Sequence, residues 1–261
     1  MRRDLVRQWN GLMKREWASM SAAFYASVVA TVLVTLLIPL SNQIFNWGVE
    51  FLEILFGVGI MWMMVGAGIP TVIFLISFVK EMNRPDIWLH STTSIFKLFG
   101  SKMAFAGFVG AMNTIIAVIV SAVGLMVSGY QFGPTFKAIV LLFTLLYMLS
   151  LLIMCAGLFV GVLYQLIKSF SSRLVSPILL LLFWFSLWLV GKIARTPAYE
   201  KIKGFGPIKG PSEGVFHFGL DNFFREIDDI VFYTGDILMG LVVGVLLFAT
   251  AVTLFEKKVR L

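Results

Sequence analysis

The feature that most constrains this chain is a series of long apolar runs that contain no charged residue. The run from Ala138 to Val162 has no Asp, Glu, Lys or Arg. An α-helix needs about 20 such residues to cross the hydrocarbon core of a bilayer, and it satisfies its backbone hydrogen bonds within the segment. A transmembrane β-strand would alternate apolar and polar residues over about ten positions, which this run does not. The runs predict an all-α, polytopic membrane protein.

Six apolar segments of this kind predict six transmembrane helices within one domain, residues 1–261. The predicted spans are 24–40, 52–79, 103–127, 136–166, 177–190 and 230–255. The second span contains small or kinking residues that allow close helix approach or a bend, namely Gly57, Gly59, Gly66, Gly68 and Pro70. The motifs Gly157–Gly161 and Gly240–Gly244 have the four-residue spacing of close helix contacts, inside the fold or between two copies.

The N-terminal segment, residues 4–20, predicts an amphipathic helix that lies on the membrane surface. It has Trp9 and Trp17 at helical spacing among aliphatic residues, with Arg7, Lys14 and Arg15 on the other face. The segment is longer and more polar than the start of a signal peptide. We therefore expect the first span to be retained as an anchor.

The distribution of basic residues predicts the orientation of the chain. With the N-terminus inside, the cytoplasmic segments hold 14 of the 21 Lys and Arg residues, and the opposite side holds 7. Six of those seven lie in the long 191–229 segment, where basic residues affect orientation less. Both termini and the 80–102 segment are therefore predicted to be cytoplasmic, in a cell membrane, while residues 191–229 are extracytoplasmic.

Motifs for catalysis are absent from the sequence. There is no GxxxxGK[ST] phosphate loop, no HExxH and no GxSxG. The histidines, His90 and His217, and the single cysteine, Cys155, form no cluster with metal-ligand spacing. We expect a chain that is not an enzyme and has no catalytic residue, bound cofactor or metal.

Three carboxylates stand near the predicted outer ends of spans. Glu50 and Glu53 sit at the outer end of the second span, and Asp236 lies near the outer end of the sixth. They could line an outer vestibule that attracts a cationic headgroup or peptide. The alternative is that they are interfacial carboxylates in water.

The 80–102 segment is the most informative part of the sequence. Arg84-Pro85 breaks the preceding helix, and Ile87, Trp88 and Leu89 then form a short amphipathic piece before Gly100-Ser-Lys102. Exposed apolar residues beside polar ones suit a docking element for a soluble partner. An interfacial helix that rests on lipid fits the pattern equally well.

The whole chain resembles the six-span permease subunits of ABC-2 type ABC exporters, which are chiefly bacterial. The resemblance rests on Lys14-Arg-Glu-Trp17 before span one, the 81–102 segment, the span count and the long outer segment before the last span. It implies that residues 80–102 are a coupling element that docks on an ATPase subunit. Glu81, Leu89 and Lys102 match the acidic residue, leucine and lysine of that element, while Ser91 to Ser94 stand where its usual proline would be.

The resemblance also implies partners. It predicts a permease that pairs with a second identical or related permease and with separate ATP-binding subunits, so ATP would be bound and hydrolysed by the partner. Nearly uncharged spans favour an amphiphilic, lipid-like or peptide antibiotic substrate. The alternatives are a ligand-sensing or scaffold membrane protein, whose 191–229 segment would bind the ligand, and a secondary transporter driven by an ion gradient.

Overall fold

The computed structural model describes residues 2–45, 51–82, 94–127, 132–170, 175–193, 195–203, 205–208 and 232–258. These residues are almost entirely helical, which confirms the predicted all-α class. Five helical stretches are long and apolar enough to cross a membrane, over Arg7–Asn42, Ile54–Met82, Ile95–Gly124, Val140–Lys168 and Thr234–Lys257. The predicted 177–190 span falls within a further apolar helix, only some of whose side chains are described.

The described part of the chain contains eight helices. They are α1 (Arg2–Phe45), α2 (Phe51–Gly66), α3 (Ile69–Met82), α5 (Ile95–Val127), α6 (Phe132–Phe170), α7 (Val175–Ile193), α8 (Pro197–Lys203) and α10 (Thr234–Lys258). Two short strands, β1 (Pro207–Ile208) and β2 (Phe232–Tyr233), pair antiparallel beside α8.

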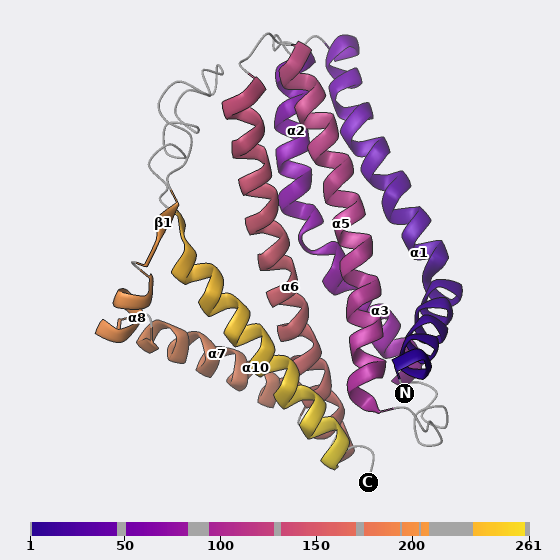
Figure 1. Cartoon of the computed structure of the whole chain (residues 1–261), viewed down its shortest axis with the longest axis vertical. Helices are drawn as coiled ribbons and strands as arrows, with labels where there is room; N and C mark the ends of the chain where they lie inside the picture. The colour runs from indigo at the N-terminus through magenta and orange to yellow at the C-terminus, as the bar shows by residue number, and fades with distance from the viewer. Residues whose placement is uncertain are drawn as a thin grey trace.

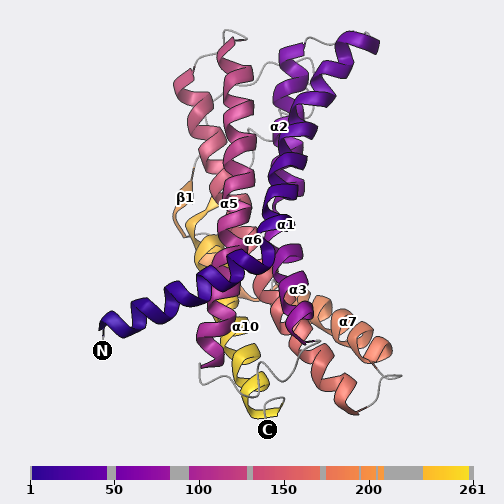
Figure 2. The same ribbon diagram turned by 90° about the vertical axis from the view of Figure 1, so that its right-hand side faces the viewer.

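Helix α5 lies at the centre of the bundle and packs against α1, α2, α3 and α6. Figure 1 shows α1, α2, α5 and α6 running side by side along the long axis, with α10 inclined against α6. Helix α7 touches α6 and runs out sideways from the end of α6 toward α8 (Figures 1 and 2). The N-terminal part of α1, the end of α3, the start of α5 and the end of α10 lie toward the same end of the long axis, which we call the terminal end.

The predicted surface helix and first span form one helix, α1, rather than two. No Gly or Pro interrupts Met20 to Phe24, so nothing in the sequence ends the helix between them. The helix bends instead, and its N-terminal part runs out sideways from the bundle (Figure 2). The ring of Trp17 packs edge-on against Phe105 of α5, with a centroid distance of 6.1 Å, which holds this part against the bundle.

The predicted second span is broken into α2 and α3. A turn at Ala67-Gly68 separates them, just before Pro70, which has no backbone N–H to continue the helical ladder. Pro70 then packs directly on Gly110 of α5, where an added Cβ would lie 2.1 Å from the Pro70 Cγ. The small residues thus supply both a bend and a close helix contact.

The core concentrates at the terminal end of the bundle. Phe74 and Phe78 of α3, Phe99 of α5 and Phe255 of α10 are buried and packed ring against ring. Gly161 of α6 makes room for this cluster, since its Cβ would lie 3.1 Å from the Phe78 ring. The Gly157–Gly161 motif therefore serves the contact between α6 and α3 inside the fold.

The connection between the second and third predicted spans is shorter than the 80–102 segment expected from the sequence. Helix α3 continues to Met82, and α5 begins at Ile95, eight residues before the predicted span. Ser94 starts α5, because its carbonyl accepts hydrogen bonds from the backbone N–H groups of Lys97 and Leu98. Residues 95–102 are thus the first two turns of a long helix.

Candidate functional site

Five polar side chains from three helices meet at the terminal end of the bundle, and we call them the charge cluster. They are Arg15, Glu16, Ser77, Glu81 and Lys102. The ammonium group of Lys102 is the centre. It lies 2.9 and 3.0 Å from the two carboxylate oxygens of Glu16 and 2.9 Å from Oε1 of Glu81. It also donates to the Ser77 hydroxyl at 2.7 Å.

The remaining contacts close the cluster. Ser77 Oγ donates to Glu16 Oε2 at 3.0 Å, and Arg15 donates to Glu81 Oε1. Two carboxylates thus face two cations, so the formal charges balance. The side chains of Lys102 and Glu16 are only 1% and 2% exposed, and burial at this level is tolerated only for charges that are paired and hydrogen-bonded.

Local sequence explains how each helix brings its residues to the cluster. Ser77 and Glu81 are four positions apart and so share one face of α3. Arg15 and Glu16 lie in the N-terminal part of α1, and Lys102 lies in the second turn of α5. The cluster therefore ties the predicted interfacial part of α1 to both α3 and α5.

Two more hydrogen bonds reinforce this connection. Lys80 Nζ donates to the Ser19 carbonyl at 3.2 Å, and Lys97 Nζ donates to the Gln8 side chain at 3.0 Å. Helix α1 is thus bound to the last turn of α3 and to the first turns of α5. These are the two elements that flank residues 83–93 of the predicted coupling element.

The structure brings together two of the five predicted coupling residues, Glu81 and Lys102. The other three, Ile87, Trp88 and Leu89, lie outside the described residues. No structural finding bears on their predicted role, which stays a prediction.

The two tryptophans of the predicted interfacial helix have different surroundings. The Trp9 ring lies beside Gly100 of α5, 3.6 Å from where a Cβ would be, and is 38% exposed. Trp17 packs against Phe24 in a tilted arrangement, with a centroid distance of 5.1 Å, and edge-on against Phe105, yet stays 40% exposed. Both rings thus combine protein contact with an outward face, as residues at a membrane interface do.

The three predicted vestibule carboxylates are not joined by the structure. Glu50 lies outside the described residues, and Glu53 lies in α2 with its side chain outside them. Asp236 is exposed in the first turn of α10. Whether they share a vestibule stays a prediction.

Sequence reasoning missed part of the charge cluster. Arg15 was placed on the polar face of the N-terminal helix, and Glu16 and Ser77 were given no role of their own. The spacing of Ser77 and Glu81 is a signal that could have identified one side of the cluster, since it places a hydroxyl and a carboxylate on one face of an apolar helix.

A second buried polar network lies deeper in the bundle. The Thr31 hydroxyl donates to Asn113 Oδ1 at 2.6 Å, and the Trp62 indole N–H donates to Thr31 at 2.9 Å. Asn113 Nδ2 donates to Ser27 Oγ at 3.1 Å and to the Val109 carbonyl at 2.8 Å. This network joins α1, α2 and α5 and satisfies the polar groups of Asn113 without charge.

Within the described part of the chain, no three His, Cys, Asp or Glu residues form a group that could hold a metal ion. In the charge cluster, Lys102 binds Glu16, Glu81 and Ser77, and Arg15 binds Glu81, while Glu81 Oε2 has no hydrogen-bond partner among the described residues. This arrangement holds the N-terminal part of α1, the end of α3 and the start of α5 in one geometry.

No protein-family profile, curated protein or solved structure matches this chain at a significant level.

Proposed function

We propose that this chain is the transmembrane permease subunit of an ATP-driven ABC exporter. One observation carries the proposal: the charge cluster ties both helices that flank residues 83–93, α3 through Glu81 and α5 through Lys102, to the N-terminal part of α1. A coupling element needs such a connection, because a push from a soluble ATPase must reach the membrane-spanning helices.

The physical argument for coupling is the cost of breaking the cluster. Separating one partner of a buried ion pair leaves an uncompensated charge, at a cost of about 3–5 kcal/mol. The N-terminal part of α1, the end of α3 and the start of α5 therefore move as one body. A displacement of residues 83–93 would therefore tilt α1 and α5.

The ATPase must be a separate subunit. The sequence contains no phosphate loop, so ATP binding and hydrolysis would take place in a soluble partner that docks at the terminal end. We propose a dimer of permeases, identical or related, with two such ATPases. The cargo would be an amphiphilic, lipid-like or peptide antibiotic molecule, since the described spans expose mainly apolar side chains.

Co-purification tests this proposal directly. A tagged chain is expressed in the membrane of its natural host, extracted in mild detergent, and its partners are identified by mass spectrometry. We expect an ATP-binding cassette subunit in a one-to-one ratio. Replacing Trp88→Ala together with Leu89→Ala should remove that subunit while leaving the permease folded.

A matched control uses the same residue types elsewhere. Leu181 and Trp184 of α7 are 67% and 64% exposed, so Leu181→Ala with Trp184→Ala should leave the ATPase bound. If the wild-type complex contains no identified ATPase under conditions where the permease is monodisperse, the exporter proposal is wrong.

A secondary transporter is the second candidate, and one observation favours it. Glu16 and Lys102 are ionisable and fully buried in helices apolar enough to span the membrane, and such residues often belong to ion pathways. Transport that survives ATP depletion but stops when the ion gradient is collapsed would identify this mechanism. Transport that stops with ATP depletion alone supports the exporter.

A further inference from the structure

A groove runs between α6 and α10 on the outside of the bundle, away from the charge cluster. Its volume is about 410 Å³, within the range of small-molecule sites, which is roughly 300–1,000 Å³. Its walls are apolar apart from one carboxylate and one thiol. The residues that define it are Met148, Leu152 and Cys155 of α6, and Asp236, Gly240 and Gly244 of α10.

Two glycines of α10 shape the groove. A Cβ at Gly244 would meet Cys155 Sγ and Leu152 Cδ1 at 3.8 Å, so the helices are in contact there. A Cβ at Gly240 would meet nothing within 4 Å, so the absent side chain leaves open space in the middle of the groove. The Gly240–Gly244 motif therefore combines a helix contact with a hollow one turn away.

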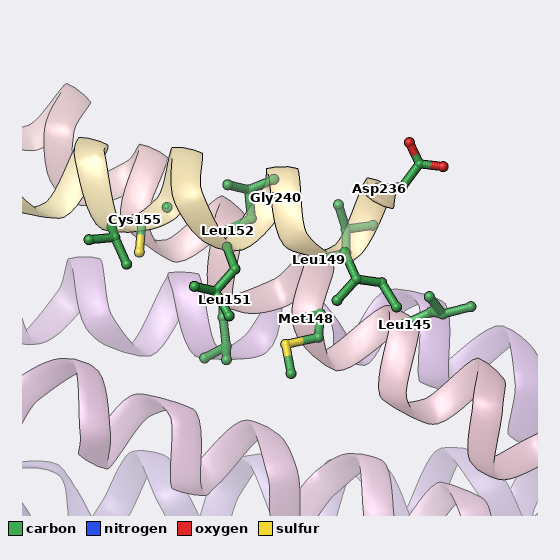
Figure 3. Close-up of a pocket in the computed structure, with 12 residues that line it drawn as sticks. Leu145, Met148, Leu149, Leu151, Leu152, Cys155, Asp236 and Gly240 are labelled. Atoms are coloured by element: carbon green, nitrogen blue, oxygen red, sulfur yellow. The ribbon is translucent and has the colours of Figure 1, made fainter. Parts of the chain in front are cut away.

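The groove has a polar end and an apolar end. Figure 3 shows the Asp236 carboxylate pointing outward at one end, while Cys155 lies toward the other. Asp236 is exposed in the first turn of α10. It lies 21 positions before Lys257, which at about 1.5 Å per residue is about 31 Å. This equals the roughly 30 Å hydrocarbon thickness, so α10 is long enough to place Asp236 and Lys257 near opposite membrane boundaries.

The length of the groove fits one leaflet. Along α10 it extends from Asp236 to Val245, nine positions or about 14 Å, which is about half of the hydrocarbon core. Leu241 and Val245 on its rim are 54% and 58% exposed, so the groove opens sideways toward lipid. It thus accepts a chain from the bilayer without passage through the aqueous phase.

We propose that this groove binds a single-chain amphiphile with a cationic headgroup. The alkyl chain lies between α6 and α10, and the headgroup rests against the Asp236 carboxylate at the interface. Charge complementarity selects this occupant, because Asp236 is the one charged residue among the groove residues. The proposal is independent of the exporter proposal, since the binding requires neither ATP nor an ATPase.

The protein carries its own probe for this site. Cys155 is the only cysteine in the chain and lines the groove, so its alkylation by N-ethylmaleimide reports occupancy. The test uses purified protein in nanodiscs of zwitterionic lipid, with dodecyltrimethylammonium as the cationic probe and dodecyl sulfate as the anionic one. We expect the cationic probe to slow alkylation at a concentration two- to fivefold lower than the anionic probe, roughly the preference given by one exposed ion pair.

Two variants distinguish the contribution of the headgroup to binding from that of the alkyl tail. Asp236→Asn should abolish the preference for the cationic probe while both probes still protect Cys155. Gly240→Leu fills the hollow and should remove protection by both probes, whereas Gly191→Leu, at an equally open glycine of α7, should leave it unchanged. Equilibrium dialysis of radiolabelled dodecyltrimethylammonium measures the same losses without relying on the thiol.

Three results would overturn the proposal. The first is that neither probe changes the alkylation rate or binds in dialysis. The second is equal protection by both probes that Asp236→Asn does not affect, which would refute the cationic headgroup. The third is alkylation that depends only on the protein-to-lipid ratio, which would mean that a second copy of the chain covers the groove.

Discussion

Lys102 is the residue on which the charge cluster depends, because it contacts both carboxylates. Replacing it by Met keeps most of the side-chain volume but leaves Glu16 and Glu81 without their central cation. Breaking a buried pair in this way costs about 3–5 kcal/mol. We therefore expect Lys102→Met to lower the free energy of unfolding by about that amount, measured by unfolding in mixed detergent micelles.

Two further variants test whether this loss of stability comes from the broken charge cluster. Adding Glu16→Gln to Lys102→Met removes one uncompensated charge and should recover part of the lost stability. Lys97→Met, at a lysine whose hydrogen bond to Gln8 is exposed, should change stability by no more than about 0.5 kcal/mol. Equal effects at Lys97 and Lys102 would contradict the structural role of the cluster.

Asn113 tests the deeper, uncharged network. Asn113→Leu removes its bonds to Thr31 and Ser27, whose hydroxyls still bond to carbonyls of their own helix. Hydrogen bonds between transmembrane helices contribute about 0.6 kcal/mol on average and at most about 1.7. We expect a loss of about 1–2 kcal/mol in the same unfolding assay.

The control for Asn113 is Thr144→Val. Among the described residues, the exposed Thr144 hydroxyl bonds only to the Val140 carbonyl one turn earlier in its own helix, so its loss should have little effect. A similar loss at both positions would show that the network adds nothing beyond local bonding.

Sequence alone identified some residues of the charge cluster and not others. Glu81 and Lys102 were found through a resemblance in the segment they flank. Glu16 was not, because it stands among basic residues in an amphipathic helix, where a carboxylate is normally solvated. Its burial depends on how α1 bends over α3 and α5, and such tertiary contacts are not visible in local periodicity.

At the scale of elements, Gly110 lets Pro70 of α3 pack directly on α5. A Cβ at Gly110 would lie 2.1 Å from Pro70 Cγ and 3.0 Å from its Cδ, and the proline ring cannot rotate away. Gly110→Ala should therefore cost about 1–3 kcal/mol through overpacking, measured as a lower unfolding midpoint. Gly57→Ala, at an open glycine of α2, should be neutral or slightly stabilising.

A second substitution distinguishes overpacking from other causes. Pro70→Ala removes the ring atoms that the new methyl group would strike, so the double variant with Gly110→Ala should regain part of the lost stability. If the double variant is as unstable as the sum of the two single variants, the close packing of Pro70 on Gly110 is not the cause.

Element boundaries were predictable where glycine and proline mark them. The break before Pro70 follows from the residues of the 52–79 run. No local signal in the sequence argues against the fusion of the surface helix with the first span. The early start of α5 was hidden because Ile95 to Lys102 contain polar residues beside apolar ones. Three of their apolar side chains, Ile95, Leu98 and Phe99, are buried in the core, whereas Phe96 is 60% exposed.

For the whole molecule, hydropathy was sufficient to predict a helical membrane protein. It did not predict which helices touch, because spans of similar composition are interchangeable in a hydropathy profile. The central place of α5 arises from small residues such as Gly110 and from polar ones such as Asn113, which give it specific partners on α1, α2 and α3.

Every role proposed for an ATPase requires that the terminal end of the molecule faces the cytoplasm. Ser94 is exposed at the start of α5, and Glu200 is exposed in α8. In a Cys155→Ala background, single cysteines at Ser94→Cys and Glu200→Cys are labelled with a membrane-impermeant maleimide in intact cells and in inside-out vesicles. We predict labelling of the Ser94 variant only in the vesicles and of the Glu200 variant only in the cells. Labelling of the Ser94 variant from outside intact cells would contradict the coupling role of the charge cluster and the exporter function with it.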